Sequence, residues 1–411
     1  MHGNKEGEWL SSRAASARLG VKLETLYAYA SRGLITSLSG DGQRGRRYAS
    51  DDVERLRTRH AARSGHGPVA ASALRFGEPV LETRISDVSP EGPRYRGYLA
   101  TALCKDGVSF ERVAELLWTS RLPERAAEPT AHLSCDAAQL WPLLSGNATL
   151  PKMALILSAL ALCDEHRHAA TDLAEFARAR ALFHWLARAP SRRPARGEPA
   201  PRVAATLLTA LRAKRTPALL SNVDRALVLC AEHELNASAF AARVAASAGA
   251  DLYACLSAAV HTLSGSAHGG MCDRVEALLV AIGSKGRAMR VVNEWLTRGE
   301  QVPGFGHPLY PEGDPRGALL VELARAHGAP SEAAKTAFAL LDAMQSGGHP
   351  APTLDAGLVT LCTCLELPSG SAAAIFALGR SAGWVAHVLE QRAAGYLLRP
   401  RARYVGSPAR E

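Results

Sequence analysis

Residues 302–316, which read VPGFGHPLYPEGDPR, hold the densest group of residues that could carry out chemistry. The stretch is rich in glycine and proline, so no regular helix or strand is expected there. Gly304 and Gly306 allow a ligand to approach the main chain, and their free amides can face an anion. His307 can donate or accept a proton near neutral pH, and Arg316 can hold a carboxylate through two parallel hydrogen bonds. These residues alone leave open the alternative of a surface loop with a solvated histidine.

Two further histidines stand on or beside expected helices. Residues 227–244 are predicted to form a helical run in which His233 and Asn236, three residues apart, share one face. His268 precedes two glycines at the entrance to a helix predicted over residues 271–282. The positive end of a helix dipole keeps a histidine neutral, so His268 is expected to donate a hydrogen bond without carrying charge.

One acidic and two basic side chains complete this group. Asp355 follows a proline-rich turn and precedes an apolar helix, where it could act as a base or merely cap the helix. Arg380 lies within a helix rich in small residues, and Arg399 lies near the end of the sequence. Taken singly, each has an ordinary explanation as a cap or a surface charge. Taken together with the histidines and Arg316, they favour one functional site.

Five motifs stand in order along the chain: EHELNAS, LSGSAHGG, PGFGHPLYPEGDPR, PTLDAGL and RPRARYVG. Together they resemble those of the citrate synthase family, over roughly residues 77–406. The resemblance implies a mainly α fold with two domains, the smaller of which closes over the substrates. It places the large domain at residues 66–268 and 361–411 and the small domain at residues 269–360. It also implies a homodimer.

The resemblance implies the reaction of an Si-type citrate synthase, in which acetyl-CoA condenses with oxaloacetate and the thioester is hydrolysed to citrate and CoA. Asp355 matches the base that takes a proton from the acetyl methyl group, and His268 matches the donor that stabilises the developing enolate. His307 matches the residue that protonates the oxaloacetate carbonyl. The residues that match the oxaloacetate site are His233, Arg316, Arg380 and Arg399, the last supplied by the partner subunit. The backbone that matches the adenine end of the CoA site is that of Pro303, Gly304, Phe305 and Gly306.

The chain departs from the family pattern at two positions. Many members have a second histidine three residues before the one that His233 matches, where this chain has Cys230. Many also have a lysine or arginine that holds a CoA phosphate, four residues after the one that His307 matches, where this chain has Pro311. We expect the first change to affect packing. We expect the second to weaken binding of the acyl carrier, or to leave that binding to another residue. Both bear on the choice between acetyl- and propionyl-CoA more than on the type of reaction.

Residues 1–65 carry a separate pattern of short helices, glycines and arginines. Helices are predicted over residues 13–19, 24–31 and 53–63, capped in the first case by Ser11-Ser12 and in the last by Asp51-Asp52. The segments TLYAYASRGLI and GRRYASDDVERLR resemble the winged helix-turn-helix of MerR-like and excisionase-like DNA-binding domains. The side chains expected to meet duplex DNA are Lys22, Thr25, Tyr27 and Tyr29 on the second helix and Arg44, Arg46, Arg47 and Tyr48 after it. The alternative is a small helical domain with a solvated basic face.

The distribution of charge supports the DNA interpretation. Residues 1–67 contain twelve Lys and Arg against seven Asp and Glu, a net +5, so the other 344 residues carry only +4 of the total +9. An excess of positive charge in one sixth of the chain is typical of a domain with a polyanionic partner.

Length and composition limit the class of protein. A chain of 411 residues with 47% apolar and few aromatic side chains indicates a helix-rich globular protein of two or three domains. Its eight cysteines have no CxxC spacing and are typical of reduced thiols in the cytosol. The N-terminus lacks the apolar core of a signal peptide, and the apolar stretch at residues 153–163 is too short to span a bilayer. We therefore expect a cytoplasmic protein with no membrane contact, no metal site and no tightly bound cofactor.

Two stretches are expected to build the scaffold of the site. Residues 77–123 predict one or two short strands followed by a helix with Phe110, Val113, Leu116 and Leu117 on one face. Residues 150–162 predict a helix so apolar on all sides that it should be buried.

Three hypotheses follow for the whole chain. The first is a citrate synthase, or a 2-methylcitrate synthase, with an added helix-turn-helix, and the intact acidic and basic set favours it. The second is a DNA-binding regulator that uses a citrate synthase-like domain to sense an acyl-CoA or a carboxylate, which the basic N-terminal domain favours. In the third, the N-terminal domain only mediates assembly.

Overall fold

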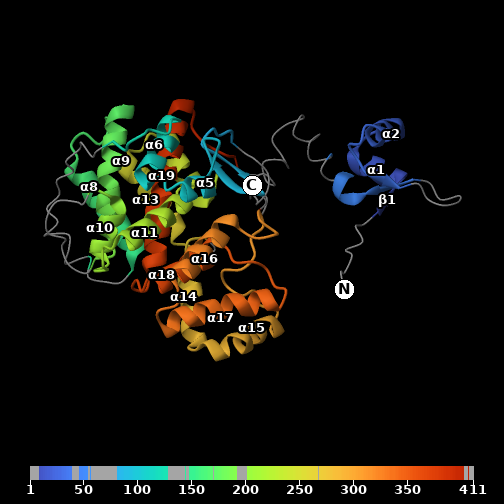
Figure 1. Cartoon of the computed structure of the whole chain (residues 1–411). Helices are drawn as coiled ribbons and strands as arrows, with labels where there is room; N and C mark the ends of the chain where they lie inside the picture. The colour runs from blue at the N-terminus through green and yellow to red at the C-terminus, as the bar shows by residue number, and fades with distance from the viewer. Residues whose placement is uncertain are drawn as a thin grey trace. The chain divides into compact units, whose positions relative to one another are not determined.

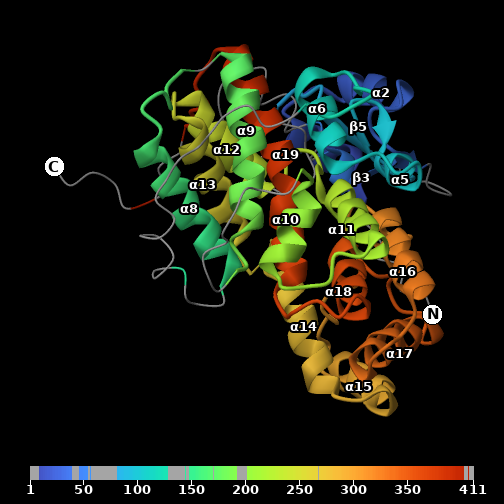
Figure 2. The ribbon, with the colours of Figure 1, turned by 60° about the vertical axis from the view of Figure 1, so that its left-hand side comes forward.

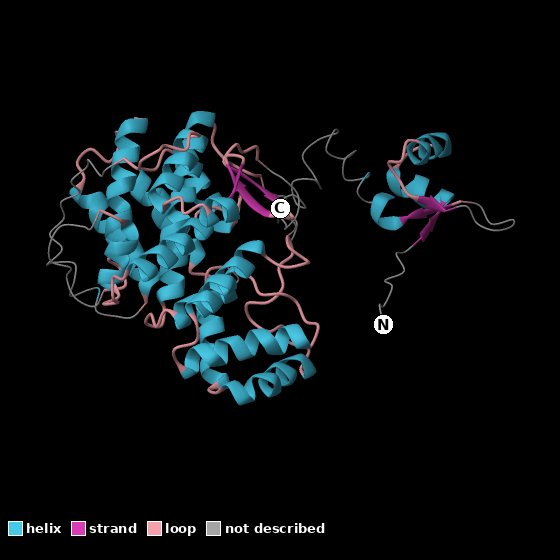
Figure 3. Ribbon diagram, in the orientation of Figure 1, coloured by secondary structure: helices cyan, strands magenta, loops and turns pink. Residues whose placement is uncertain are grey.

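The computed structural model of the chain describes residues 9–38, 46–53, 56, 81–127, 144, 148–169, 171–191, 201–266, 268–401 and 406. Helices dominate the described residues, and the strands form two small three-stranded sheets (Figures 1 and 3). The predicted mainly α fold is therefore confirmed. The chain divides into two compact units, one formed by residues 1–82 with 399–411 and the other by residues 83–398.

The first unit contains a helix-turn-helix and a small antiparallel sheet. Its elements are β1 (Trp9–Ser11), α1 (Ser12–Leu19), α2 (Leu23–Ser31), β2 (Ser37–Leu38) and β3 (Arg47–Ala49), with the strand order β1-β3-β2. The Ser11 hydroxyl caps α1 by accepting a hydrogen bond from the amide of Ala14. Gly20 ends α1 in the left-handed region, with φ at 66°. The C-terminal end agrees with the prediction, and the helix begins one residue earlier than predicted, at Ser12.

One residue of this unit differs from its predicted role. Tyr48 was expected to face phosphates, but its side chain is fully buried in the small core of the unit. Successive side chains of a strand point to opposite faces, so on β3 Tyr48 faces the core while Arg47 is exposed. The Arg47 side chain is therefore accessible, as its predicted role requires, and the Tyr48 prediction is wrong.

The third helix of this unit begins earlier than predicted. Residues 50–53 are already helical, so Asp51 and Asp52 lie inside the first turn and do not precede it as caps. Asp52 Oδ2 instead accepts a hydrogen bond from the backbone amide of Thr36 at 2.7 Å, which ties the helix to the segment before β2. Most of the predicted span 53–63 lies outside the described residues.

The second unit begins with a sheet and two helices. They are β4 (Ser86–Ser89), β5 (Gly92–Tyr95), β6 (Tyr98–Leu99), α5 (Ala100–Lys105) and α6 (Phe110–Thr119), and the strands are antiparallel in sequence order. The sequence suggested one or two strands here, and the structure has three. The four apolar residues predicted to share a face of α6 are all fully buried, which confirms that prediction.

The main core of the second unit forms around α19 (Ser371–Ala394). The helices α8 (Thr149–Cys163), α9 (Asp172–Ala187), α10 (Val203–Ala210), α11 (Pro217–Cys230), α12 (Ala237–Ser247) and α13 (Leu252–Leu263) belong to this core. α19 contacts α6, α11, α12 and α13 directly, and Figure 2 shows it running among them. α19 is long and apolar enough to cross a membrane, but 94% of its most apolar window is buried within the fold. That burial is typical of a core helix in a globular protein.

One scaffold prediction holds only in part. α8 forms where the apolar run was predicted, and most of its side chains are buried. Its last turn is not, because Leu162 is 84% exposed. The prediction that the helix is buried on all sides is therefore wrong at its C-terminal end.

The remaining helices of the second unit include three that carry or follow predicted site residues. The whole set is α14 (Met271–Ile282), α15 (Ala288–Thr297), α16 (Pro315–His327), α17 (Glu332–Ser346) and α18 (Leu354–Cys364), with a short 3-10 helix, η2 (Lys285–Arg287), before α15. The three helices beside predicted site residues are α14, α16 and α18. α15 and α17 lie side by side in both views and share a hydrophobic cluster with the end of α14 (Figures 1 and 2). This second cluster falls within residues 269–360, and the predicted domain boundaries themselves stay a prediction.

Candidate active site

A break between α11 and α12 creates the first part of the site. The single helical run predicted over residues 227–244 is wrong, because α11 ends at Cys230 and the next helix is capped by the side chain of Asn236. Glu234, in between, has a φ of 54°, which a right-handed helix does not accommodate. His233 therefore lies in a loop and shares no helical face with Asn236.

The break also frees a backbone carbonyl that positions Arg380. The carbonyl oxygen of Cys230 accepts a hydrogen bond from Arg380 Nε at 2.9 Å. The guanidinium carbon lies 4.8 Å from the ring centroid of Phe376, one turn earlier on α19. Arg380 is only 2% exposed, and neither of its Nη atoms has a hydrogen-bond partner among the described residues. A buried guanidinium with unused donors is suited to hold an anion.

A second buried guanidinium stands at the start of α16. Arg316 Nε and Nη2 donate to the two carboxylate oxygens of Asp314, at 3.1 and 2.8 Å, and both side chains are nearly inaccessible to solvent. Asp314 caps α16, because its Oδ1 also accepts from the Arg316 amide at 3.0 Å. The remaining nitrogen, Arg316 Nη1, is buried without a hydrogen-bond partner among the described residues. Leaving such a donor unpaired costs about 1–3 kcal/mol, so we expect a ligand to pair with it.

Three rings gather in front of Arg316. The ring centroids of His233 and His307 lie 5.5 Å apart, and Tyr310 lies 5.8 Å from the first and 5.3 Å from the second. Tyr310 Oη is 3.3 Å from His233 Nε2, and the guanidinium carbon of Arg316 is 5.8 Å from the tyrosine ring centroid. Burial and the neighbouring positive charges of Arg316 and Arg380 lower the pKa of His233 well below its usual value. Burial is also the main cause that lowers the pKa of His307.

His268 lies just before α14, as predicted, and a serine holds its ring. Its Nε2 is 2.9 Å from Ser238 Oγ, which also accepts a hydrogen bond from Trp384 Nε1 at 3.1 Å. The single hydroxyl hydrogen of Ser238 has two acceptors within reach, His268 Nε2 and Asn236 Oδ1 at 2.7 Å. Donation to Asn236 leaves the ring proton of His268 on Nε2, where it is donated to Ser238, whereas donation to His268 leaves that proton on Nδ1. Burial, followed by the charge of Arg380, lowers the pKa of His268 to about 4, so the ring is neutral as predicted, with burial as the main cause.

Asp355 does not cap α18. Thr353 occupies the cap position, and Asp355 stands in the first turn of the helix with its carboxylate turned toward α14. Cys272 Sγ donates a hydrogen bond to Asp355 Oδ1 at 3.3 Å, and Thr353 Oγ1 is 3.5 Å from Asp355 Oδ2. Burial raises the pKa of the Asp355 carboxyl, while Cys272 and the positive charge of Arg316 oppose that rise. A carboxylate made more basic in this way is suited to remove a proton from carbon.

Most of the predicted residues lie close enough to shift one another's pKa values. Both arginines, His307 and His268 lower the pKa of His233, and Arg316 opposes the rise in the pKa of Asp355. The three histidines and Asp355 are all partly exposed, whereas Arg316 and Arg380 are buried behind them. Segments that are distant in sequence thus present a base, neutral imidazoles and two guanidinium groups together.

The predicted CoA-binding segment is largely internal. Pro303, Gly304 and Phe305 are buried, and only Gly306 is exposed. Gly304 has a φ of 85°, and a Cβ there would lie 2.6 Å from a methyl group of Val275 on α14, so the position requires glycine. The expectation of a free amide at Gly306 is wrong, because that amide donates to the carbonyl of Ala351 at 3.0 Å. Contact of this segment with CoA stays a prediction.

Two further predictions concern Arg316 and Arg399, and their outcomes differ. The stretch 302–316 has no regular structure up to Asp314, but α16 already begins at Pro315, so Arg316 is helical. Arg399 is exposed and belongs to the other compact unit, and its predicted role stays a prediction.

Comparison with known proteins identifies the second unit. The family model described as "Citrate synthase, C-terminal domain" matches residues 75–401. A relative from Bacillus subtilis named "Citrate synthase 2" is 31% identical over 359 residues, which cover 82% of this chain and 96% of its own. A relative from Mycobacterium tuberculosis is 38% identical over 210 residues, but the match spans only about half of each protein, 50% of this chain and 56% of that one. This chain belongs to the citrate synthase family.

Solved structures and a second family model agree with this membership. The crystal structure of citrate synthase from Thermotoga maritima superposes with a TM-score of 0.70 at 26% identity and covers 82% of this chain and 96% of its own. A Thermoplasma acidophilum citrate synthase, in ternary complex with carboxymethyl coenzyme A and oxaloacetate, shares the fold at 23% identity and a TM-score of 0.65, covering 81% of this chain and 95% of its own. Residues 10–67 match the model described as "MerR HTH family regulatory protein".

Sequence reasoning missed four side chains that contact the predicted site residues. Asp314 was foreseeable, since an acidic residue before Pro315 is a helix-start signal. Tyr310, Ser238 and Cys272 carry no local signal, because each acts on a histidine or a carboxylate from a distant segment.

At Cys230 and Pro311, the two departures from the family pattern, the structure shows simple environments. Burial raises the pKa of the Cys230 thiol to about 12, so it is protonated and does not join proton transfer at neutral pH. Pro311 is exposed in a turn after Tyr310 and brings no charge to the site.

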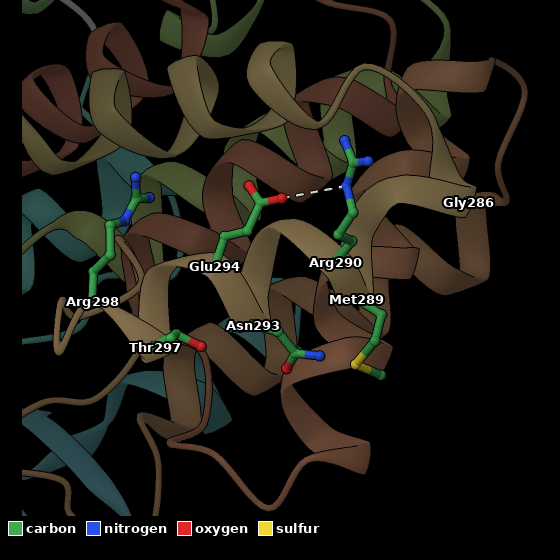
Figure 4. A pocket seen from close by; sticks show the side chains of 7 residues that line it. All are labelled: Gly286, Met289, Arg290, Asn293, Glu294, Thr297 and Arg298. Carbon is green, nitrogen blue, oxygen red and sulfur yellow. Dashed lines mark ion pairs between the residues drawn. The ribbon is translucent and has the colours of Figure 1, made fainter.

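A hollow on the surface of α15 lies apart from these residues. Its lining, shown in Figure 4, comes from Gly286, Met289, Arg290, Asn293, Glu294, Thr297 and Arg298. It includes an exposed ion pair at 3.4 Å between Arg290 and Glu294, and none of the predicted site residues. We assign no reaction to it.

Acid should destabilise the fold through the histidines of the site. The pKa values of His233, His268 and His307 are lowered in the folded chain, so below about pH 6.5 the unfolded chain binds more protons. Stability from these groups is therefore complete above about pH 6.5 and falls as the pH falls, for His268 over the range down to about pH 4. Denaturant unfolding at pH 7 and pH 5 checks this. A His268→Asn variant should show a smaller pH effect, and an exposed His261→Asn variant the native one.

Proposed function

We propose that this chain condenses acetyl-CoA with oxaloacetate and hydrolyses the product thioester to citrate and CoA. One observation carries the proposal. Arg316 Nη1 is a buried cationic donor without a partner among the described residues, beside a group that holds a raised-pKa carboxylate and neutral imidazoles. A site of this kind is complementary to a dicarboxylate that is bound next to a second substrate, from which a proton must be removed from carbon.

Oxaloacetate binding falls to the two buried arginines. Arg316 offers Nη1 and Arg380 offers both Nη atoms, so each can hold one carboxylate. His233 and His307 lie beside Tyr310, whose ring faces the Arg316 guanidinium, and a ketone between the two carboxylates would lie near these rings. His307 would hydrogen-bond the carbonyl oxygen and protonate it as the new carbon–carbon bond forms.

Asp355 and His268 together convert the acetyl group of acetyl-CoA to its enol form. Asp355 takes a proton from the acetyl methyl group, and the electron pair moves onto the thioester oxygen. The Nδ1–H of His268, left free when Ser238 donates to Nε2, hydrogen-bonds that oxygen as charge develops there. The enol carbon attacks the ketone, and water then cleaves the thioester and releases CoA. A neutral donor fits this step, because a charged imidazolium near Arg380 would be costly.

The acyl group is a finer choice. A relative from Shewanella oneidensis named "2-methylcitrate synthase" is 34% identical over 214 residues, which supports propionyl-CoA as an alternative substrate. The experiment that tests the proposal mixes the purified chain with oxaloacetate and either acetyl- or propionyl-CoA and follows CoA release with a thiol reagent. We expect release with at least one of them. Release with neither would overturn the enzymatic proposal and favour a ligand-sensing role.

A second role, DNA binding, is supported by the match of residues 10–67 to the MerR helix-turn-helix family. Lys22 at the start of α2, Tyr27 on α2, and Arg46 and Arg47 before and in β3 are exposed, as a DNA surface requires. Thr25 and Tyr29 are partly buried. Arg44 lies outside the described residues. We propose that a dimer of the chain binds two half-sites and reports on the carboxylate or acyl-CoA occupancy of the second unit.

Binding to duplex DNA should depend strongly on salt and on the arginines of the first unit. An Arg46→Ala, Arg47→Ala double variant should lose about tenfold or more in affinity at low salt and show a shallower salt dependence, since two phosphate contacts are removed. Electrophoretic or polarisation titrations at two salt concentrations measure both. A Lys214→Ala, Arg215→Ala variant, which removes two exposed charges from the second unit, should bind like the native chain. Equal binding by a chain that begins at Gly67 would argue against this role.

We also propose that the chain is a homodimer, cytoplasmic like the enzyme its motifs resemble, in which Arg399 of one subunit completes the site of the other. Leu162, in the last turn of α8, and Leu173, in the first turn of α9, have exposed apolar side chains, which support a contact surface on this part of the fold. Sedimentation of the full chain tests the oligomeric state.

A further inference from the structure

Cys272 occupies an unusual place relative to the two groups assigned to proton transfer. It stands in the first turn of α14, four residues after His268, and its side chain is fully buried. The connection between the two is tight, because a Cβ on Gly269 would lie 2.5 Å from the carbonyl oxygen of Leu263. The segment that places His268 thus also places the thiol, with little freedom to move one without the other.

The thiol holds one oxygen of the Asp355 carboxylate and leaves the other nearly free. Cys272 Sγ is 3.3 Å from Oδ1, which is within the range of a sulfur hydrogen bond. Among the described residues, the side chain that hydrogen-bonds Oδ2 is Thr353, through Oγ1 at a long 3.5 Å. Burial raises the pKa of the thiol well above its usual value, so sulfur keeps its hydrogen and acts as the donor. Oδ2 is therefore the oxygen that remains available to a substrate proton.

The other charged and titratable groups around Asp355 come from two more elements. Arg316 and Asp314 face it from the start of α16, and Cys230 faces it from the end of α11. Arg316 is already engaged by Asp314 through two hydrogen bonds. Among the described residues, Cys272 is thus the group that hydrogen-bonds Asp355 from a neighbouring helix.

We propose that Cys272 is a positioning residue, which orients the Asp355 carboxylate so that Oδ2 meets the acetyl methyl group. This inference rests on the proposed function. A thiol is a weak donor, so it fixes the orientation of the carboxylate while taking little of its basicity. A hydroxyl in its place stabilises the charged carboxylate more and makes it a weaker base. An alanine removes the side-chain hydrogen bond from α14 to Oδ1 and leaves the carboxylate freer to rotate.

The test compares native protein with Cys272→Ala and Cys272→Ser. In the alanine variant we expect kcat to fall roughly tenfold with the KM for oxaloacetate unchanged, because substrate binding is left intact. Loss of a hydrogen bond to the charged carboxylate raises its pKa, so the acid limb of the kcat profile should move up by about half a pH unit or more. The serine variant should restore part of kcat and move the limb back, to the native pH or below it.

A Cys364→Ala variant is the matched control, since it removes another fully buried thiol from the far end of the same helix as Asp355. Its kcat profile should match that of the native chain. A shift of the same size in this control, or a native profile in Cys272→Ala, would overturn the proposal. Thermal unfolding of each variant shows whether packing alone has changed.

A second readout does not need turnover. Infrared difference spectra between the native chain and Cys272→Ala isolate the S–H stretch of Cys272 and the carboxyl band of Asp355. We expect the S–H band at the lowered frequency of a hydrogen-bonded thiol, and an Asp355 carboxyl that titrates at a higher pH in the alanine variant. Absence of turnover in the native chain would reject the proposed reaction. The spectra would still show whether Cys272 hydrogen-bonds Asp355 and affects its titration. A free S–H frequency with an unchanged titration would reject the inference itself.

Discussion

Replacing Asp355 with asparagine should lower the rate of CoA release by roughly 10²- to 10⁴-fold, the usual contribution of a general base. The change keeps the size of the side chain and its Oδ1 acceptor for Cys272, so the surrounding helices have no reason to move. Only the capacity to take a proton is lost. Because oxaloacetate binding falls to other residues, its dissociation constant should change little. Steady-state kinetics and calorimetric titration with oxaloacetate measure the two quantities separately.

Asp342→Asn is the control for this variant. Asp342 is an exposed carboxylate on α17, paired with Arg325 at 2.8 Å, and its change to asparagine alters the same chemical group at the surface. We expect native kinetics. Retention of more than a tenth of the native rate by Asp355→Asn would falsify its assignment as the base.

Replacing Arg316 with lysine should weaken oxaloacetate binding by roughly 10- to 100-fold, because a guanidinium hydrogen bond to a carboxylate contributes about 1.5–3 kcal/mol. Lysine keeps the positive charge beside Asp314, so the buried carboxylate is not left uncompensated. It cannot reproduce the geometry in which Nε and Nη2 engage Asp314 while Nη1 remains unpaired among the described residues. The expected signature is a raised KM for oxaloacetate with a smaller change in kcat.

Arg325→Lys provides a control on the same helix. Arg325 lies near the C-terminal end of α16, is half exposed and pairs with Asp342 at the surface. Its conservative replacement should leave the KM unchanged. If Arg316→Lys binds oxaloacetate as tightly as native protein, and unfolds at the native temperature, then Nη1 does not meet a substrate carboxylate.

Local signals were enough to place several elements. Gly269-Gly270 and the apolar spacing after them predicted α14 with its observed bounds, and Gly20 predicted the end of α1. Caps, glycines and helical spacing act within a few residues of each other, so neighbours in sequence suffice to read them.

The break at His233 shows where such reading fails. The apolar spacing from residue 227 to residue 244 is that of one helix, yet α11 stops at Cys230. Two distant partners compensate the lost helical bonds there. Arg380 donates to the freed carbonyl of Cys230, and the carbonyl of Ala231 accepts from the amide of Gly383. A Cβ at Gly383 would also lie 1.9 Å from Glu232 Oε2, so α19 can approach the loop only through a glycine. None of this is visible within the segment itself.

The amino-acid sequence by itself determined which reactive side chains the chain has, their order along it, and the family whose motifs they form. Tertiary structure alone decided their protonation and their partners. His268 is neutral chiefly because it is buried near Arg380, and Asp355 is made more basic by burial while Cys272 and Arg316 oppose that effect. These shifts arise because solvation and charge act through space, between residues that only the fold brings within a few ångströms of each other.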